Sequence, residues 1–123
     1  MSFTVYGISA SSGAEGWLIH NNTIVDWSFG VVTLATPSGF SKNHSIYNNE
    51  IYHTKYNLGW GKGIQINGQL KYENGYTYNR VYNNYFHDLS STGISVCGNG
   101  NYIYYNIIAR ITESVTMNCN LRC

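Results

Sequence analysis

The stretch Ile46-Tyr47-Asn48-Asn49-Glu50-Ile51 decides the fold, because versions of it return at three other places in the chain. The pattern is an apolar residue, two variable residues, asparagine, one variable residue and a second apolar residue. The other copies are Ile19-His20-Asn21-Asn22-Thr23-Ile24, Val81-Tyr82-Asn83-Asn84-Tyr85-Phe86 and, more loosely, Ile103-Tyr104-Tyr105-Asn106-Ile107-Ile108. The second asparagine recurs at intervals of 27, 35 and 22 residues. Repeats of this length are typical of solenoids.

A second signal follows each asparagine, namely a glycine and then alternating apolar residues. The copies are Gly30-Val31-Val32-Thr33-Leu34, Gly63-Ile64-Gln65-Ile66, Gly93-Ile94-Ser95-Val96 and a last one without the glycine, Ser114-Val115-Thr116-Met117. Residues 4–7 look like the tail of a preceding repeat. Period-two alternation indicates short strands with one set of side chains inward. Such strands cannot bury a face alone, so the repeats must stack as parallel strands about 4.8 Å apart.

Stacking places equivalent residues of successive repeats over one another. The expected inward columns are Ile19/Ile46/Val81/Ile103 and Ile24/Ile51/Phe86/Ile108. Asn22, Asn49, Asn84 and Asn106 form a ladder at a bend, where asparagine tolerates a left-handed backbone and its amide bonds along the stack. We therefore predict an all-β, right-handed parallel β-helix of about four to five rungs, as one domain over residues 1–123. It lacks obvious end caps, which indicates either a piece of a longer protein or end-to-end or trimeric self-association.

Across roughly residues 17–118, this repeat resembles that of the pectin-lyase-like superfamily of parallel β-helices. That superfamily includes polysaccharide lyases, glycoside hydrolases, epimerases, phage tailspikes and adhesins, so the resemblance implies the fold and leaves the activity open. The Asn-Thr-Asp, Asp-Asp, Gly-His-Gly and Arg-Ile-Lys strings of polygalacturonases do not occur, nor does the Asp-Pro-His-Glu string of mannuronan epimerases. Calcium-dependent pectate lyases need a cluster of carboxylates, and the chain has only two Asp and four Glu from which to form one.

Composition narrows the classes of partner. Charged residues make up 11% of the chain and the formal charge is +1, so the basic stripe of a nucleic-acid-binding protein is not expected. The apolar stretches are too short to span a membrane, and no signal peptide is visible after Met1. Cys97, Cys119 and Cys123 lack zinc-site spacing, so we predict no metal and no cofactor. Free thiols and a disulfide from Cys97 to one of the other two both stay open.

Candidate catalytic residues lie in one column and in two long loops. The fourth residue after each ladder asparagine is Asp26, His53, Asp88 or Arg110, which stack outward about 5 Å apart. A carboxylate beside a histidine is typical of acid/base chemistry, and His87 is adjacent to Asp88. Turns after strands also favour polar residues whatever their function. The loops at 54–62 and 69–78 add Lys62 and Glu73 as catalytic candidates, with Trp60 and Tyr72 as substrate-binding candidates.

A second outward column comprises His20, Tyr47, Tyr82 and Tyr104. Its tyrosines are candidates for binding a sugar through their ring faces, although stacked aromatics also stabilise a sheet. A third group, Thr33/Gln65/Ser95/Thr116 with Asn67, Cys97 and Asn118, is expected to face solvent. The sequence thus predicts recognition of a polysaccharide by an extracellular or cell-surface protein. Cleavage as a lyase or hydrolase, binding or adhesion without cleavage, and a purely structural role all stay open.

Overall fold

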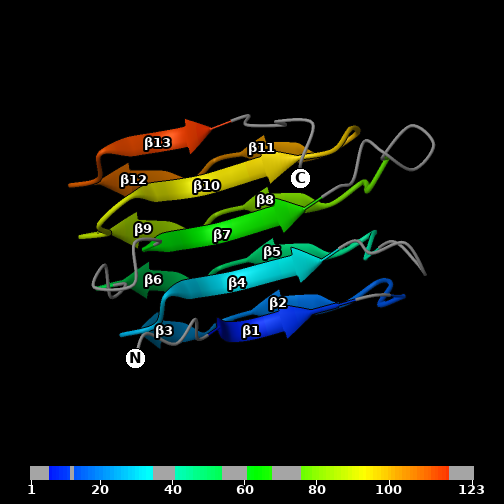
Figure 1. The fold of residues 1–123 in the computed structure, drawn as a ribbon, viewed down its shortest axis with the longest axis horizontal. Helices are drawn as coiled ribbons and strands as arrows, with labels where there is room; N and C mark the ends of the chain where they lie inside the picture. Colours follow the sequence, from blue (N-terminus) through cyan, green and yellow to red (C-terminus); the bar gives the residue numbers. More distant parts are fainter. Residues whose placement is uncertain (1–5, 12, 35–40, 54–60, 68–75, 117–123) are drawn as a thin grey trace, which may run out of the picture.

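The computed structural model describes residues 6–11, 13–34, 41–53, 61–67 and 76–116. These residues form thirteen β-strands in three parallel sheets (Figure 1). The strands are β1 Tyr6–Ala10, β2 Leu18–His20, β3 Thr23–Val25, β4 Phe29–Leu34, β5 Ser45–Tyr47, β6 Glu50–Tyr52, β7 Lys62–Asn67, β8 Arg80–Tyr82, β9 Tyr85–His87, β10 Thr92–Cys97, β11 Tyr102–Tyr104, β12 Ile107–Ala109 and β13 Glu113–Thr116. The described part contains no helix, and so none that could cross a membrane.

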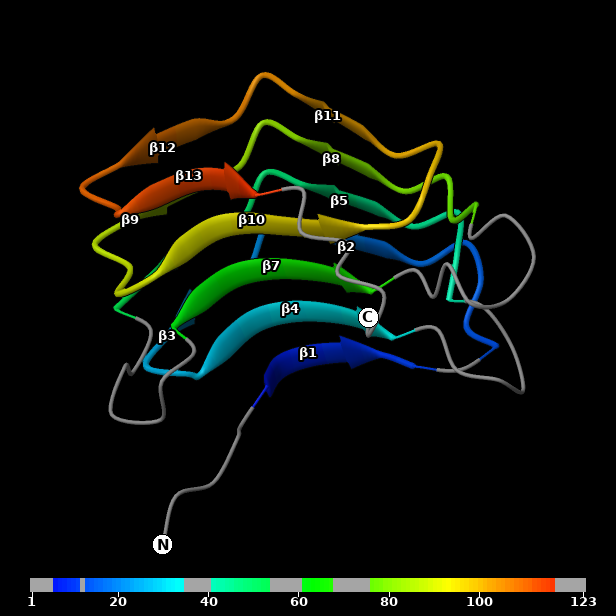
Figure 2. The same ribbon diagram turned by 45° about the horizontal axis from the view of Figure 1, so that its top comes forward.

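Each rung contributes one strand to each sheet. Sheet I contains β1, β4, β7, β10 and β13; sheet II contains β2, β5, β8 and β11; sheet III contains β3, β6, β9 and β12. Figure 2 shows the successive rungs as stacked layers, with β1 at one end of the stack and β11 to β13 at the other. Four complete rungs and the additional strand β1 confirm the predicted all-β parallel β-helix. The expected tail of a preceding rung is β1, whose Tyr6 pairs with Phe29.

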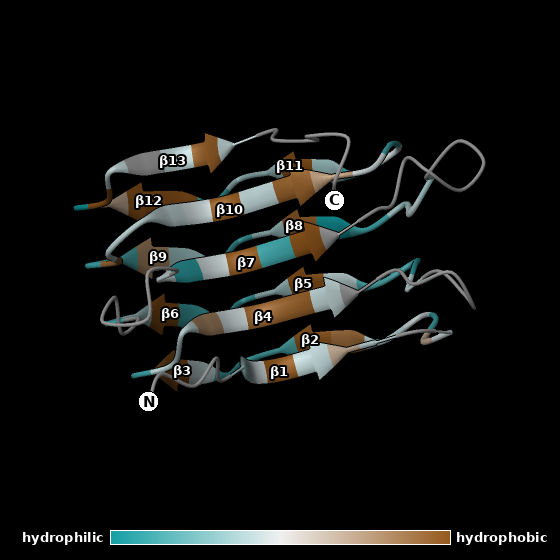
Figure 3. Cartoon of the chain, viewed as in Figure 1, coloured by the Kyte–Doolittle hydropathy of each residue, from teal (hydrophilic) through white to brown (hydrophobic). Residues whose placement is uncertain are grey.

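The core consists of the predicted inward columns. Ile19, Ile46, Val81 and Ile103 are in register through sheet II, and Ile24, Ile51, Phe86 and Ile108 through sheet III. Sheet I adds Val31, Ile64 and Ile94, all fully buried. Figure 3 shows the hydrophobic positions recurring from strand to strand along the stack. Burying a side chain of this size stabilises a fold by about 1.5–3 kcal/mol, so the columns supply most of the driving force.

The prediction for the third outward group was wrong at Thr33. Thr33 pairs with Ile66 and is buried, whereas Val32 pairs with Gln65 and occupies the outward position. The glycine at the second position of β4, β7 and β10 gives the correct register when residues are counted from it, whereas aligning the polar residues of the three strands does not. Three other register pairs of this group are as expected, namely Gln65–Ser95, Ser95–Thr116 and Asn67–Cys97. Asn118 lies outside the described residues.

The outer face of sheet I is also less open to solvent than we predicted. Val32, Ser95 and Cys97 are all buried. Alternation along a strand determines which way a side chain points, and not whether another segment covers it. Cys119 and Cys123, the two possible disulfide partners of Cys97, lie outside the described residues.

The asparagine ladder is confirmed. The backbone N–H and the Nδ2 of each asparagine donate to Oδ1 of the asparagine in the next rung, all at 3.0 Å, from Asn22 through Asn49 and Asn84 to Asn106. Nδ2 also donates back to a carbonyl of the preceding rung, as from Asn84 to Ile46 at 2.9 Å. The ladder thus satisfies the N–H of each asparagine and a nearby carbonyl at a bend between two strands, where the adjacent residues keep backbone hydrogen bonds between rungs.

Left-handed residues recur every five positions within a rung. They are Gly16, Asn21 and Asp26; Asn43, Asn48 and His53; Tyr78, Asn83 and Asp88; Gly100, Tyr105 and Arg110, with φ between 49° and 74°. The left-handed residue at the ladder bend is therefore the one before each ladder asparagine, contrary to our expectation. A ladder asparagine keeps an ordinary backbone so that its amide can point along the stack.

Tyr105 is one of two tyrosines among these left-handed residues, and its backbone conformation leads to a prediction. Its φ is 53°, its side chain is 82% exposed, and its one ring contact is edge-on to Tyr104. The three equivalent rung positions carry asparagine, which tolerates this conformation better. We expect Tyr105→Asn to raise the free energy of unfolding by about 0.5–1 kcal/mol, measured by urea denaturation. A loss of stability would mean that the Tyr104 contact outweighs the backbone strain.

A second ladder runs along the bend that precedes sheet II. The N–H of Trp17 donates to Nδ1 of His44 at 3.1 Å, the N–H of His44 to Oδ1 of Asn79 at 3.0 Å, and the N–H of Asn79 to Oδ1 of Asn101 at 3.0 Å. His44 therefore takes an asparagine's place, with Nδ1 as the acceptor. Its Nε2 must then carry the proton and donate to Ser41 Oγ at 2.7 Å, which itself donates to the Ala10 carbonyl.

This buried histidine predicts a loss of stability in mild acid. Burial lowers the pKa of His44 below its ordinary value, and the nearby Glu15 carboxylate offsets only part of that effect. The unfolded chain takes up a proton below about pH 6.5 and the folded chain only at lower pH. The free energy of unfolding should therefore fall as pH drops below 6.5, and stop falling below the folded-state pKa.

His44→Asn tests this prediction, since asparagine restores the acceptor present at positions 79 and 101. We expect the variant to show a flatter dependence of unfolding free energy on pH between about 5 and 6.5, measured by urea denaturation. An unchanged slope would assign the acid sensitivity to another group.

Candidate functional site

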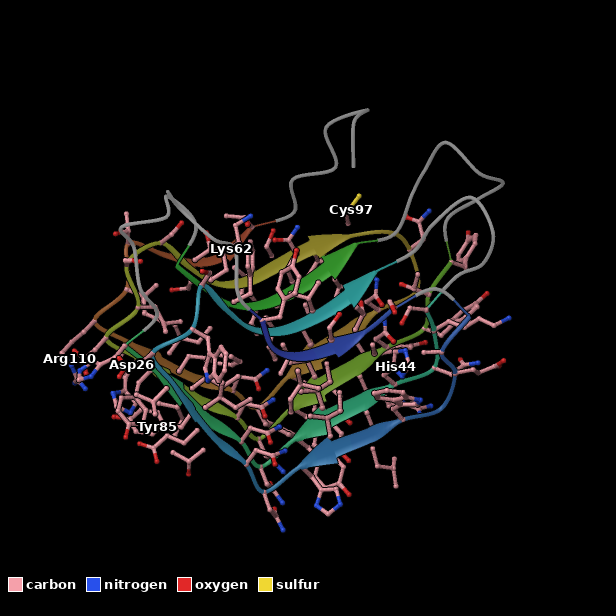
Figure 4. The ribbon with its side chains drawn as sticks, turned by 60° about the horizontal axis from the view of Figure 1, so that its bottom comes forward. Asp26, His44, Lys62, Tyr85, Cys97 and Arg110 are labelled. Atoms are coloured by element: carbon pink, nitrogen blue, oxygen red, sulfur yellow. The ribbon has the colours of Figure 1, made fainter. Side chains whose placement is uncertain are left out.

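The candidate site lies on the outer face of sheet III. Glu50 pairs with Tyr85, and Tyr52 pairs with His87, so these four side chains share one face of β6 and β9. Asp88 and Arg110 follow in the turns after β9 and β12. Figure 4 shows Asp26, Tyr85 and Arg110 on one side of the solenoid, away from His44 and Cys97. We call Glu50, His87, Asp88 and Arg110 the charged cluster.

The charged cluster links three rungs by hydrogen bonds. His87 Nε2 lies 2.8 Å from Glu50 Oε1, and its Nδ1 lies 2.8 Å from Asp88 Oδ2. Arg110 holds Asp88 with two bonds, Nε to Oδ1 at 2.6 Å and Nη2 to Oδ2 at 2.9 Å. Because both ring nitrogens of His87 face carboxylate oxygens, both must donate, which requires the imidazolium. With His87 protonated, two positive and two negative charges balance.

The pKa values follow from these contacts. Burial lowers the pKa of His87, but the hydrogen bonds to Asp88 and Glu50 outweigh it, so the net shift is upward. The Arg110 guanidinium, and then His87, hold the pKa of the Asp88 carboxyl well below its usual range. The hydrogen bonds to Asp88 and Tyr85 raise the pKa of Arg110 further. The contribution of His87 to stability is therefore present below pH 6.5 and is lost as pH rises through its raised pKa.

Two tyrosine rings enclose the imidazole. Tyr52, from the rung before, stacks on His87 with ring centroids 4.7 Å apart and planes 10° from parallel. Tyr85, from the same strand, lies 4.4 Å away at 29°. An aromatic face attracts a cation at this range, so both rings favour the protonated histidine and fix its orientation.

Some of the predicted catalytic residues meet here and others do not. Asp88 and Arg110 are in direct contact, as their shared column predicted. His53 lies in that column, and its N–H donates to the Asp88 carbonyl at 3.1 Å, but its ring packs edge-on against Tyr52 instead of reaching the carboxylate. Lys62 is the first residue of β7 in sheet I, with Nζ 3.5 Å from Ser95 Oγ, so it lies apart from the cluster.

Three predicted site residues, Trp60, Tyr72 and Glu73, lie outside the described residues, so their roles stay predictions. Sequence reasoning did not connect Glu50 with His87, nor Tyr52 and Tyr85 with either. Period two along β6 and β9 was the available signal, because residues 50 and 52 share a face, as do 85 and 87. In the described part, no group of three or more His, Cys, Asp or Glu side chains is arranged to hold a metal ion.

The tyrosine column on sheet II is confirmed as a continuous stack. The ring centroids of His20 and Tyr47, Tyr47 and Tyr82, and Tyr82 and Tyr104 are 4.9, 5.0 and 5.1 Å apart, with planes within 8° of parallel. The faces of Tyr47 and Tyr82 are therefore filled by neighbouring rings. A sugar cannot lie flat on them, so any binding here would have to use ring edges and hydroxyl groups.

No protein-family model matches the chain, and neither the curated proteins nor the solved structures contain a match to it. The parallel β-helix is thus established by the fold itself, and the likeness to the pectin-lyase-like superfamily stays a resemblance of repeat pattern.

Proposed function

We propose that this solenoid recognises a polysaccharide along the outer face of sheet III, within a carbohydrate-active β-helix protein of the pectin-lyase-like kind that acts outside the cell or on its surface. The observation that carries the proposal is the charged cluster, in which side chains from three successive rungs are held by mutual hydrogen bonds. A polymer lying along the stack would meet rung after rung, which suits a chain of repeated sugar units.

The chemistry of this face suits hydroxyl-rich ligands. Arg110 is 60% exposed and Glu50 44% exposed at the side chain, so both keep hydrogen-bonding capacity toward solvent. Tyr85 is 37% exposed and adds an aromatic surface with a polar edge. Because Glu50 and Tyr85 lie on strands and Arg110 is held by two hydrogen bonds to Asp88, a ligand orders few side chains on binding. The balanced charges favour a neutral or weakly anionic saccharide.

The same geometry supports binding more than cleavage. Glycoside hydrolysis ordinarily needs one carboxyl that is protonated near neutral pH and a second carboxylate across the bond. The low pKa of Asp88 makes it a poor acid, and both nitrogens of His87 are engaged. A lyase would have to draw its base from elsewhere, and His53, exposed at the edge of the cluster, is the nearest candidate.

A glycan array on the purified chain tests the proposal, with Arg110→Ala compared with Arg80→Ala. Arg80 is an exposed arginine on sheet II and serves as the matched control. We expect the parent and Arg80→Ala to bind the same glycans, and Arg110→Ala to bind roughly tenfold or more weakly. Thermal unfolding curves of all three proteins show whether weaker glycan binding results from a loss of folded protein.

A parallel screen for new reducing ends and unsaturated products decides between binding and cleavage. Binding without product would support a recognition module. Product formed by the parent and not by His53→Ala would make the chain an enzyme. Equal loss of binding in both arginine variants would contradict the placement on sheet III, and no binding at all would favour a structural role.

A further inference from the structure

The charged cluster on sheet III has two forms, one with His87 protonated and one with His87 neutral, and they present different surfaces to a ligand. We infer that His87 is a proton switch for the glycan-binding face: the protonated ring holds Glu50 in place, and loss of its proton releases Glu50 and weakens binding. The switch rests on the proposed function, because it regulates that same face.

The contacts of the ring make the two forms different. His87 Nε2 lies 2.8 Å from Glu50 Oε1 and Nδ1 lies 2.8 Å from Asp88 Oδ2, so each nitrogen of the protonated ring donates to a carboxylate. A neutral imidazole carries hydrogen on one nitrogen only, and its other nitrogen is an acceptor. That acceptor would face a carboxylate oxygen with no hydrogen between them. One of the two contacts must therefore open when the proton leaves.

The ring is held in a position that faces both carboxylates. The His87 side chain is 12% exposed, and Tyr52 and Tyr85 stack on it with ring centroids 4.7 and 4.4 Å away. Because close packing of this kind fixes the plane of the ring, the imidazole keeps its orientation in both protonation states. The conflict is relieved by movement of a carboxylate.

The contact to Glu50 is the one that opens. Arg110 donates to Asp88 through Nε at 2.6 Å and through Nη2 at 2.9 Å, which keeps this carboxylate beside His87 Nδ1. In the described part, the Glu50 carboxylate has no hydrogen-bond partner besides His87, and its side chain is 44% exposed. Glu50 therefore moves into water readily, whereas Asp88 would have to leave a bidentate ion pair. The remaining ring hydrogen stays on Nδ1.

Release of Glu50 changes the binding face in two ways. The bond between Glu50 and His87 joins β6 to β9 across the outer face, so without it a ligand must order the Glu50 side chain on binding. The charged cluster also passes from no net charge to one net negative charge, which disfavours a weakly anionic saccharide. Both effects weaken binding above the pKa of His87.

The neighbouring ionisable groups do not reproduce this switch. The groups around His87 come from β6 and the turn after it, from its own strand and turn, and from the turn after β12: Glu50, Tyr52, His53, Tyr85, Asp88 and Arg110. Among them, His53 is the other group with an ordinary pKa near neutrality, and its ring contacts Tyr52 and neither carboxylate. Burial lowers the pKa of His87 while the hydrogen bonds to Asp88 and Glu50 raise it by more, so the switch operates above pH 6.5.

Glycan-array binding, repeated from about pH 6 to about pH 9, tests the inference with neutral and uronate-containing glycans compared. We expect the parent to bind roughly threefold to tenfold more weakly at the top of the series than at the bottom. The loss should be larger for the uronate-containing glycans, because the change in charge adds to the cost of ordering Glu50. Circular dichroism at both ends of the series shows whether the chain stays folded.

The Glu50→Gln variant should lose this pH dependence, because an amide either accepts from or donates to His87 Nε2. Its binding should change less than about twofold across the series. Glu15→Gln is the matched control, since it removes an exposed carboxylate before β2, and it should keep the pH profile of the parent. Each protein is compared with itself at the two ends of the series, so differences in absolute affinity cancel.

An NMR titration without glycan separates the switch from the binding. The His87 ring signals should titrate above pH 6.5, and the Glu50 side-chain signals should move with the same midpoint. A ring that stays protonated through about pH 9, or Glu50 signals that do not follow it, would overturn the inference.

The remaining outcomes distinguish the switch from the proposed function. Equal binding across the series would overturn the switch and leave glycan recognition on sheet III standing. No binding at any pH would overturn the proposed function, and with it the regulation of that face. A pH dependence that persists in Glu50→Gln would assign the change to another group, and its loss in His53→Gln would identify that group as His53.

Discussion

Gly63→Ala is expected to lower the free energy of unfolding by about 3 kcal/mol or more. A Cβ at this position would lie 2.5 Å from the Gly93 carbonyl oxygen, 2.7 Å from Phe86 Cδ1 and 3.0 Å from Leu89 Cδ1. The oxygen belongs to the backbone of the neighbouring rung, so it cannot move without disturbing the pairing of β7 with β10. Urea denaturation followed by circular dichroism measures the loss.

Gly13→Ala is the control for this substitution. Nothing lies within 4 Å of a Cβ at Gly13, and its φ of +78° adds backbone strain of about 1–2 kcal/mol. Gly63 has no such left-handed φ, so Gly13→Ala measures backbone strain without a steric contact, and a larger loss for Gly63→Ala must come from the contact between rungs. If Gly63→Ala costs no more than Gly13→Ala, the rungs have room to separate, and the glycines of sheet I are not what sets their distance.

Asn84→Leu should destabilise the solenoid by about 3–5 kcal/mol. Asn84 is buried and makes four side-chain hydrogen bonds, accepting from the N–H and Nδ2 of Asn49 and donating to the Ile46 carbonyl and Oδ1 of Asn106. Leucine has a similar volume but no polar atoms, so it leaves Asn49 N–H and the Ile46 carbonyl without these partners inside the stack. Chemical denaturation gives the change in free energy directly.

Asn22→Leu, the same substitution in the first rung, provides the comparison. The Asn22 side chain donates to Asn49 Oδ1, but that oxygen keeps its bond from the Asn22 backbone N–H. We therefore expect Asn22→Leu to cost about 1 kcal/mol or less. Equal losses at positions 22 and 84 would show that leucine is disfavoured at this bend for steric reasons, and that the ladder bonds contribute little.

The sequence by itself determined the rung, the inward columns and the asparagine ladder. Ile46, Asn49 and Ile51 recur with their spacing intact, and a period of two decides which side chains point inward once the strands stack. The repeat did not determine the function of the protein, because the same repeat fold supports many different activities.

Only the tertiary structure decided that the His87 ring contacts Glu50. The glycines of sheet I and the period of two along β6 and β9 already indicate, in the sequence, that Val32 takes the outward position and which residues share a face. Spacing cannot show which side-chain atoms meet between rungs. The sequence predicted the tyrosine column of sheet II and left both stacking and sugar binding open. The structure decided that the ring faces lie on one another, since ring orientation depends on rotamers chosen by packing. Local periodicity determines which way a side chain points, whereas contacts between rungs depend on how the whole stack comes together.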